Sequence, residues 1–369
     1  MNGSDNATVF ERAARGRPVP HTPIWIMRQA GRYLPEYRKL RRKVDFITAT
    51  RTPEIAARIT LQPMERFAMD ASILFSDIMT PLDPMGVEVT FAPGPVLPDP
   101  VRTPEAARAV RELVPEEGVP FVLDAIRAVR GELRPEAALI GFAGAPFTLF
   151  CYLVEGGGSK DFMTARSFLR REPEASRALL DTLGRSMARY LVAQAEAGAN
   201  AVMLFDSWIG MLGPDTYMRF VHPVLTRAFA TVRAATACPI IYFPNRGGPL
   251  LRSMRGLDVD VVAIDWTLPL SRADRLLGGG RALQGNLDPA ELFGRPEALR
   301  RAADAVLAEA ESLAGHIFSL GHGIDRRTDP DQVARLVDHV HERGRAGADQ
   351  VRWDGWRGPG SRPRAGNRR

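Results

Sequence analysis

The chain has 369 residues, of which 45% are hydrophobic and 25% charged, a composition typical of globular proteins that bury a substantial core. Its formal net charge of +6 and its pI of ≈ 9.7 would suit a nucleic-acid-binding protein. Residues 344–369, however, carry seven arginines and two aspartates and hence a net charge of +5, so the rest of the chain is nearly neutral and nucleic-acid binding by it is not expected.

The charge distribution divides the chain into two parts. We expect one domain over residues 1–343, followed over residues 344–369 by an Arg/Gly/Pro-rich tail whose composition predicts disorder. The two cysteines, Cys151 and Cys238, exclude a disulfide framework and favour a reducing compartment. Residues 1–20 lack the apolar core of a signal peptide, and Pro146 interrupts the longest uncharged stretch, so we expect a cytoplasmic protein that does not cross a membrane.

Eight short apolar runs recur along the chain with helical segments between them. None alternates cleanly between apolar and polar residues, so each is predicted to be a strand covered on both faces, as in a parallel sheet enclosed by helices. Eight such units predict an α/β fold with a single (β/α)8 barrel of the TIM type. A doubly wound open sheet is the alternative, although the glycine fingerprint of a dinucleotide-binding sheet is missing after the first run. The runs are residues 23–27, 71–75, 138–142, 201–205, 239–243, 260–264, 281–285 and 316–320.

Four of the intervening segments carry clear helix signals. Residues 174–198 place apolar side chains on one face and end in a glycine, which is typical of a helix C-terminus. Residues 214–235 and 296–314 each begin with a proline, which suits the first helical turn. The last helix is predicted over residues 329–342.

Polar and ionisable residues follow nearly every apolar run. In a (β/α)8 barrel the active site lies at the C-terminal ends of the strands, so these residues are expected to surround a single site. They are Arg28, Arg32, Asp77, Tyr152, Ser207, Asn245, Asp265, Asn286 and His322.

Arg28 and Arg32 form the first candidate group, directly after the first run. Two guanidiniums four residues apart favour binding of an acidic ligand, because each holds a carboxylate in a planar fork. The alternative is a structural ion pair with a protein carboxylate, for which Glu36 and Asp45 are close enough in sequence.

Asp77 and His322 form the second group. Asp77, flanked by apolar residues, is either a loop cap or ion-pair partner of Arg28, or a lone carboxylate in a dry cleft that stabilises a transient cation. A charge pair at about 4 Å contributes roughly 4 kcal/mol at an effective dielectric near 20, enough to influence a rate. His322 lies between two glycines that leave its ring open to a ligand, so a role in the site is favoured.

Several other chemistries find little support. Ser207 lacks the small-residue elbow of a serine hydrolase and is expected to form hydrogen bonds, while Tyr152 could donate to a carboxylate or serve in the core. No metal site is expected, because neither cysteine has ligand spacing to the other or to a histidine. The three lysines lie outside the apolar runs, which disfavours a Schiff-base enzyme.

A longer set of motifs resembles one family. Residues 23–38, with the sequence PIWIMRQAGRYLPEYR, closely resemble the N-terminal signature of uroporphyrinogen decarboxylases. Residues 244–248 and 324–329 depart from the pattern of that family. The resemblance covers roughly residues 8–343 and continues in the blocks 75–78, 141–148, 152–159, 265–267, 284–289 and 321–323.

This resemblance implies a cofactor-free, homodimeric cytoplasmic enzyme with a (β/α)8 barrel. Such enzymes convert the four acetate side chains of uroporphyrinogen III into methyl groups, giving coproporphyrinogen III and four CO2. It further implies that Asp77 accepts hydrogen bonds from the pyrrole N–H groups. By motif position, Arg28, Arg32 and Arg41 would bind substrate carboxylates, Tyr152, Ser207 and His322 would add polar contacts, and Gln29, Phe142 and Phe205 would line the cleft.

The chemistry of such a reaction agrees with the residues. A pyrrole protonated on a ring carbon becomes an iminium-like cation that can accept the electron pair released with CO2, and an ionised Asp77 would stabilise that cation. The proton donor stays open between Arg28, Tyr152 and water. Two rival functions are a zinc-dependent methyltransferase of the same superfamily, acting on a thiol or corrinoid, and a non-enzymatic binder of nucleic acid or acidic surfaces through the basic tail.

Overall fold

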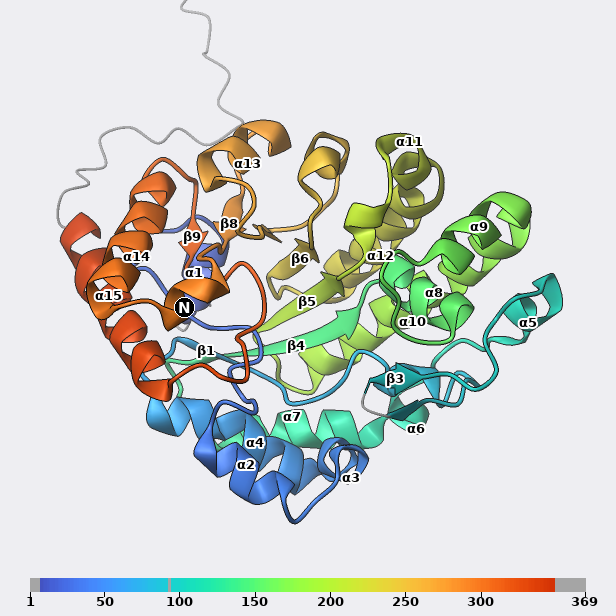
Figure 1. Ribbon diagram of the computed structural model, residues 1–369, viewed down its shortest axis with the longest axis horizontal. Helices are drawn as coiled ribbons and strands as arrows, with labels where there is room; N and C mark the ends of the chain where they lie inside the picture. Colours follow the sequence, from blue (N-terminus) through green and yellow to red (C-terminus); the bar gives the residue numbers. More distant parts are fainter. Residues whose placement is uncertain (1–6, 92–93, 349–369) are drawn as a thin grey trace, which may run out of the picture.

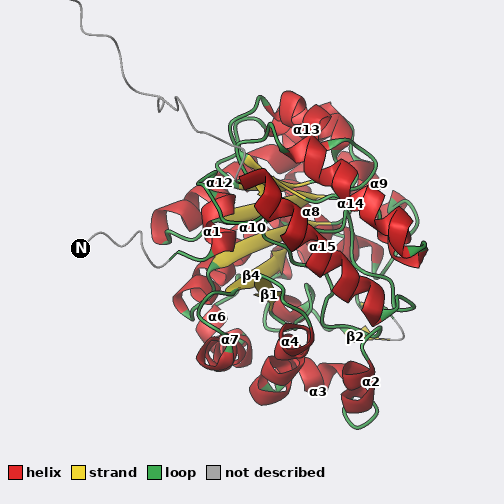
Figure 2. Cartoon of the chain, turned by 90° about the vertical axis from the view of Figure 1, so that its left-hand side faces the viewer, coloured by secondary structure: helices red, strands yellow, loops and turns green. Residues whose placement is uncertain are grey.

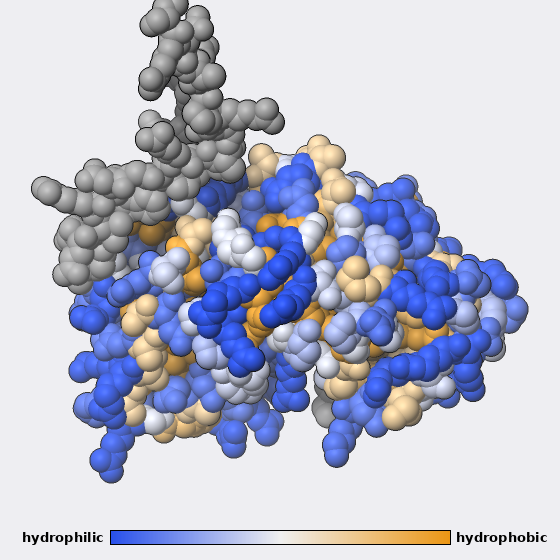
Figure 3. Space-filling model, turned by 90° about the horizontal axis from the view of Figure 1, so that it is seen from above, coloured by the Kyte–Doolittle hydropathy of each residue, from blue (hydrophilic) through white to orange (hydrophobic). Residues whose placement is uncertain are grey.

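The computed structural model describes residues 7–91 and 94–348. Residues 349–369, which make up most of the predicted disordered tail, lie outside this part of the chain. Within the described residues, no helix is long and apolar enough to cross a membrane. Hydrophilic side chains cover most of the face of the molecule shown in Figure 3, with smaller apolar areas between them.

The centre of the fold is a curled parallel sheet of seven strands with helices outside it (Figure 1). Seven of the eight apolar runs are confirmed as strands of this sheet, and every strand is fully buried. Every pair of neighbouring strands in this sheet is parallel, so all strands end at the same edge. The order is β1 (Ala71–Ile73), β4 (Ala138–Gly144), β5 (Ala201–Asp206), β6 (Ile240–Pro244), β7 (Val261–Ala263), β8 (Ala282–Gln284) and β9 (His316–Ile317).

The first predicted run, residues 23–27, is not a regular strand of this sheet. It lies between the two edge strands and forms one isolated parallel bridge, between Ile24 and Phe318. On the β9 side, Trp25 donates its N–H to the Phe318 carbonyl at 3.3 Å and Phe318 donates to the Pro23 carbonyl at 2.8 Å. On the β1 side, Asp70 donates its N–H to the Ile24 carbonyl at 2.9 Å. The seven-stranded sheet therefore does not confirm the eighth strand of the predicted barrel, although the segment contacts both edges.

Side chains explain why this segment forms no ladder. The N–H of Ile24 donates to Oδ2 of Asp70 at 2.8 Å, and the N–H of Ile26 donates to Oε1 of Gln29 at 3.0 Å. A parallel ladder needs these donors for a neighbouring strand. Both are bonded instead to side chains, which a pattern of apolar residues does not reveal.

The helices that follow the strands enclose the sheet, as the view in Figure 2 also shows. The helix predicted over residues 174–198 is confirmed as α10, and that over 296–314 as α14, four residues shorter at its C-terminus. The helices are α1 (Val9–Ala14), α2 (Pro35–Arg41), α3 (Phe46–Arg51), α4 (Pro53–Arg66), α5 (Pro104–Ala109), α6 (Pro115–Gly118), α7 (Pro120–Glu132), α8 (Pro146–Glu155), α9 (Met163–Arg171), α10 (Pro173–Glu196), α11 (Pro214–Thr216), α12 (His222–Ala235), α13 (Leu270–Leu277), α14 (Pro296–Ala310) and α15 (Pro330–Ala348).

Two helix predictions differ from the structure. Residues 214–235 form α11, a π-helical turn over Tyr217–Val221 and then α12, rather than one helix. Pro223 lacks the N–H that a continuous α-helix would donate to the preceding turn, so the helix is interrupted just before it. The last helix continues to Ala348 instead of ending at about Glu342. The first residues assigned to the tail are thus helical.

A small antiparallel pair, β2 (Thr90–Phe91) with β3 (Pro95–Val96), lies outside the main sheet and follows the loop after β1. The sequence analysis does not predict it, because its strands are only two residues long. Phe91 and Pro95 from this pair both border the cleft described next.

Candidate active site

A cleft of ≈ 1720 Å³ opens where the strands end. It brings together most of the residues that follow the apolar runs, as expected for a site at the C-terminal ends of parallel strands. Asp77, Arg28, Arg32 and His322 all border this one space, although up to 294 positions separate them in the chain. Of the predicted site residues, those lining the cleft are Arg28, Arg32, Arg41, Asp77, Phe142, Phe205, Ser207 and His322.

Asp77 lies in the loop after β1, and its backbone is fixed by a short local turn. Its Oδ1 accepts the N–H of Met79 at 2.8 Å, and its carbonyl accepts the N–H of Thr80 at 3.1 Å. In the described part of the chain, Oδ2 has no hydrogen-bond partner. Burial raises the pKa of Asp77, while the Met79 N–H and the Arg28 guanidinium oppose that rise. The cleft thus presents one poorly solvated carboxylate oxygen that is open to a donor.

Arg28 reaches the cleft from an unusual backbone conformation, with φ of 65° in the left-handed region. Two glycines accommodate it. A Cβ on Gly31 would lie 2.7 Å from the Arg28 carbonyl oxygen, and a Cβ on Gly323 would lie 2.7 Å from Cδ of Arg28. The N–H of Ile324 donates to the Met27 carbonyl at 3.0 Å and holds the two segments together. The glycine after His322 therefore leaves space for the Arg28 side chain.

Arg28 and Arg32 do not form the ion pairs with Glu36 or Asp45 that were the alternative interpretation. Glu36 pairs with Arg66 at 3.4 Å, and Asp45 instead accepts the N–H of Thr48 at 2.9 Å at the start of α3. Among the described residues, no protein carboxylate lies within ion-pair distance of Arg28 or Arg32. Both side chains are exposed and can therefore meet an acidic ligand.

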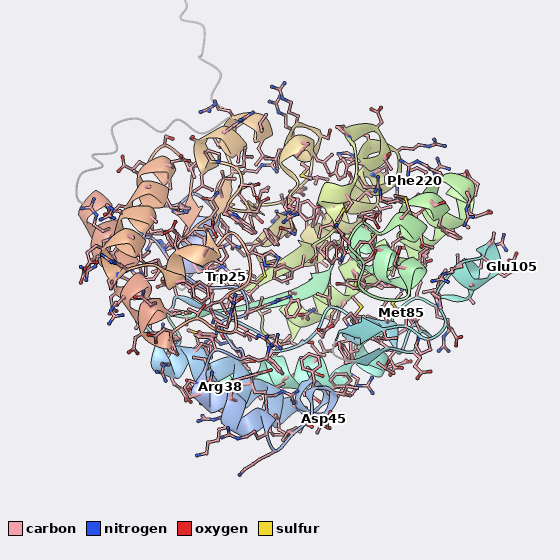
Figure 4. All side chains as sticks on the ribbon, viewed as in Figure 1. Trp25, Arg38, Asp45, Met85, Glu105 and Phe220 are labelled. Atoms are coloured by element: carbon pink, nitrogen blue, oxygen red, sulfur yellow. The ribbon has the colours of Figure 1, made fainter. Side chains whose placement is uncertain are left out.

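Arg41 is more constrained than Arg28 and Arg32. Its guanidinium donates to the carbonyl of Val44 and lies over the ring of Phe46, 5.7 Å from the centroid. Figure 4 shows Arg38 and Asp45, two further cleft residues, on the neighbouring α2 and α3 segments. Helices α2 and α3 thus bring a group of charged side chains to one border of the cleft.

His322 borders the cleft from the segment after β9. Its ring meets Phe243 and Trp266 edge to face, at centroid distances of 6.3 and 6.2 Å. Burial lowers its pKa first, and the nearby guanidiniums of Arg28 and Arg246 lower it further. His322 is therefore a neutral imidazole at neutral pH, able to donate from one nitrogen and accept at the other.

Aromatic side chains make another part of the cleft apolar. Phe142 from β4 and Phe205 from β5 meet edge to face with centroids 5.5 Å apart, and Phe205 meets Phe243 of β6 at 6.2 Å. Ser207 borders the cleft just beyond them, and its carbonyl accepts the side-chain N–H of Asn245 at 3.1 Å. A flat apolar ligand with acidic substituents would match this combination of surfaces.

The structure does not place Gln29 or Tyr152 on the cleft wall. Gln29 is fully buried, and its amide accepts from Ile26 and donates to the Ala71 carbonyl at 3.1 Å, so its place in the cleft lining is corrected to a structural position. Tyr152 is half-buried on α8 and packs against Trp208. Burial raises the pKa of Tyr152, with Asp77 and Arg28 near enough to act on it in opposite directions.

Asp206 is a fully buried acid that was not predicted as a site residue. Its Oδ1 accepts the hydroxyl of Thr148 at 2.8 Å and its Oδ2 accepts that of Tyr242, also at 2.8 Å. Burial raises the pKa of Asp206 to about 6, although both hydroxyls oppose that rise. It lies between Phe205 and Ser207 in the chain, and its position at the end of β5 is the available signal in the sequence.

Arg326 and Arg327 also border the cleft and were not named as site residues. They lie in residues 324–329, which depart from the family pattern, and that departure was the available signal. Arg327 pairs with Asp325 at 2.9 Å, with both side chains exposed. Asn245, Asp265 and Asn286, in contrast, do not line the cleft. The last two hold loops: Asp265 accepts the N–H of Arg246 at 2.9 Å, and Asn286 donates to the Asp265 carbonyl at 3.0 Å.

Comparisons with known proteins give a consistent result. Residues 5–343 match the family model described as "Uroporphyrinogen decarboxylase (URO-D)". A protein of Syntrophotalea carbinolica named uroporphyrinogen decarboxylase is 46% identical over 332 residues, 90% of this chain and 96% of its own. One of Streptomyces avermitilis with the same name is 47% identical over 336 residues, 90% and 94% of the two chains. A solved "methyltransferase from Methanosarcina mazei" has a TM-score of 0.76 at 20% identity, covering 91% and 98% of the chains, and this likeness shows the fold alone.

Proposed function

The chain belongs to the uroporphyrinogen decarboxylase family, and from this membership we propose how its cleft carries out the reaction. The activity is the decarboxylation of uroporphyrinogen in porphyrin biosynthesis, and the enzyme is a carboxy-lyase. The observation that carries the proposal is the combination of one open carboxylate, Asp77, with the guanidiniums of Arg28 and Arg32, for which residues 7–91 and 94–348 provide no carboxylate partner. We also propose that residues 23–27 take the place of the eighth strand and close the barrel, because they contact both edges of the sheet.

In the proposed complex the macrocycle lies against Phe142 and Phe205, with its pyrrole N–H groups directed at Asp77. Uroporphyrinogen carries eight carboxylates on its rim, and Arg28, Arg32 and Arg41 bind those nearest to them. His322 and Ser207, which also line the cleft, supply neutral hydrogen-bonding groups to the substrate. This arrangement fixes the reacting acetate relative to the carboxylate, which converts binding energy into orientation.

The reaction needs a proton and an electron sink for each acetate. Protonation of a pyrrole ring carbon gives an iminium-like cation, and the bond between the acetate methylene and its carboxyl then breaks. Its electron pair moves into the ring as CO2 leaves, and protonation of the exocyclic carbon with loss of the ring proton gives the methyl group. Each cycle consumes one proton and releases one CO2, and ionised Asp77 stabilises the cation throughout.

The fixed geometry of Asp77 is what makes it effective in this role. Its Oδ1 is held by Met79, so little reorganisation accompanies the formation of the cation. Arg28 orients the reacting carboxylate and, like Tyr152, lies close enough to Asp77 to affect its surroundings electrostatically. Burial raises the pKa of Tyr152, so its phenol keeps its proton at neutral pH, and because Tyr152 does not line the cleft it could deliver a proton only through water.

The experiment that tests this function is incubation of the purified protein with uroporphyrinogen III in the dark without oxygen. The products are then oxidised to porphyrins and separated by their number of carboxylates. We expect successive appearance of the hepta-, hexa-, penta- and tetracarboxylates without an added cofactor or metal. A substrate that keeps all eight carboxylates under these conditions would contradict the proposal.

Two further expectations come from the family resemblance. We propose that the enzyme is a homodimer and that it acts in the cytoplasm. Light scattering coupled to size-exclusion chromatography should give twice the monomer mass of 40.6 kDa. Fractionation of cells that express the chain tests its location.

A further inference from the structure

Three side chains from distant parts of the sequence converge outside the cleft. Nε2 of His21 lies 2.8 Å from Oδ1 of Asp70, and Nε2 of His341 lies 2.8 Å from Oδ2 of the same carboxylate. The two imidazole rings are 4.6 Å apart between centroids. In the described ranges 7–91 and 94–348, these residues form the one group of three His, Cys, Asp or Glu side chains whose ligand atoms all lie within 4.8 Å of one another.

The group lies at the end of the barrel opposite to the cleft. Asp70 immediately precedes β1, whereas Asp77 in the cleft follows that strand. His21 precedes the segment 23–27, and His341 lies on α15. A Cβ on Gly344 would lie 2.6 Å from the backbone nitrogen of Thr22, so α15 packs directly against this first segment. The three side chains therefore join the beginning of the barrel, its first strand and its last helix.

We propose that His21, Asp70 and His341 form a structural binding site for a divalent transition-metal ion of the zinc class. Two imidazoles and one carboxylate are the ligand types that zinc prefers, and a water molecule would complete a tetrahedral set. Metal bonds of about 2.0–2.2 Å separate neighbouring ligand atoms by about 3.4 Å, so the present 2.8 Å contacts need to open by roughly 0.6 Å. Side-chain rotations supply such a movement.

The surroundings of Asp70 suit a ligand role. Its side chain and those of the two histidines are 11%, 16% and 15% exposed, so an ion can enter without unfolding the site. The N–H of Ile24 donates to Oδ2 at 2.8 Å and holds the carboxylate in place, as outer-sphere donors do at metal sites.

This site is separate from the chemistry in the cleft. A bound ion would cross-link the N-terminal segment, the start of β1 and α15, and would raise thermal stability without a role in decarboxylation. It also changes how zinc analysis is interpreted. Zinc bound stoichiometrically would not by itself indicate a methyltransferase, because the bound ion would lie at the wrong end of the strands.

The test uses the full-length chain without a purification tag, stripped of metal with a chelator. Zinc chloride is titrated by calorimetry, and thermal unfolding is followed with and without the ion. We expect one Zn²⁺ per chain and a higher Tm in its presence. The variants His21→Gln and His341→Gln should each weaken zinc binding by more than the about 10–100-fold lost when an outer-sphere partner is removed. The rise in Tm should disappear with it.

His339→Gln is the matched control. His339 lies on the same helix, is 12% exposed and bonds a single carboxylate, with Nε2 2.9 Å from Oδ1 of Asp304. It should keep the affinity for zinc. In the unmodified chain, Co²⁺ should show the intense visible absorption of a tetrahedral site, a result that needs no variant to fold. The proposal would be wrong if the chain did not bind one ion, or if the two ligand variants bound zinc as tightly as the control. The three side chains would then form a hydrogen-bonded cluster only.

Discussion

Asp77→Asn is the most direct test of the proposed chemistry, because it removes one charge and almost no volume. The Oδ1 of asparagine can still accept the Met79 N–H that Asp77 accepts at 2.8 Å, so the turn after β1 should keep its shape. What changes is the second oxygen, which becomes an N–H2 group. That group donates where the pyrrole N–H groups also donate, and it carries no charge to stabilise a cation.

The expected loss follows from the electrostatics. A carboxylate about 4 Å from a unit positive charge contributes roughly 4 kcal/mol at an effective dielectric near 20. Each 1.36 kcal/mol in the barrier is tenfold in rate, so loss of the charge should lower kcat by about 1000-fold. The lost acceptor for the pyrrole N–H groups adds to this figure. Stability should not fall, because burial raises the pKa of Asp77 and the ionised group is therefore unfavourable in the empty cleft.

The assay measures initial rates of formation of the heptacarboxylate product, together with Tm for each protein. Asp288→Asn is the matched control, since Asp288 also borders the cleft and its Oδ1 accepts the N–H two residues ahead, from Ala290 at 2.9 Å. It should retain most of the activity. An Asp77→Asn enzyme that works within tenfold of the normal rate would refute the electrostatic role of Asp77, and a large fall in Tm would show that the loss is structural.

Three further predictions concern residues around the cleft and the end of the chain. Burial raises the pKa of Asp206 to about 6, so the folded protein binds a proton there more tightly than the unfolded chain does, and the free energy of unfolding should fall by up to about 3 kcal/mol as pH rises from 4 to 6. Urea denaturation of Asp206→Asn at several pH values should not show this fall. Parallel pH curves for the variant and the unmodified protein would contradict the assignment. Gly323→Ala places a methyl group 2.7 Å from Cδ of Arg28 and should displace its guanidinium. We expect kcat/KM to fall about 10–100-fold while Tm changes by a few degrees at most. Unchanged kinetics would mean that Arg28 does not bind the substrate. Removal of residues 349–369 should leave the steady-state rates unchanged and abolish any binding to nucleic acid, whereas loss of decarboxylation would assign the tail a catalytic role.

The sheet could be predicted from the sequence because its strands are buried on both faces. Each appears as a short apolar run, and seven of the eight runs are strands of one parallel sheet. The exception, residues 23–27, has the same apolar pattern but gives its N–H groups to Asp70 and Gln29. Competition between side chains and a ladder for the same donors is a tertiary effect, and a local pattern does not contain it.

The cleft residues were predictable to a similar extent and for a related reason. Position after a strand was enough to bring Arg28, Asp77 and His322 to one space, since parallel strands end at the same edge. The family resemblance implied that Gln29 lines the cleft, but Gln29 is fully buried beside the exposed Arg28, and the motif does not reveal this difference between neighbours.

The proposed metal ligands could not be predicted from the sequence, for a different reason. Asp70 is separated from His21 by 49 positions and from His341 by 271, whereas the spacings that identify metal sites are local. The packing of the N-terminal segment and of α15 against the start of β1 brings these side chains together, so only the fold reveals them.

In the free enzyme, the unfavourable free energy of charge burial lies at Asp77 rather than at the arginines of the cleft. Arg28 and Arg32 are exposed and solvated by water, so the absence of a carboxylate partner among the described residues costs little. Asp77 is different, because burial disfavours its charged form, as its raised pKa indicates. A substrate that donates N–H groups to Oδ2 relieves this penalty and should lower the pKa of Asp77 on binding. The acidic limb of kcat should therefore lie at lower pH than that of kcat/KM, since the first reports the complex and the second the free enzyme.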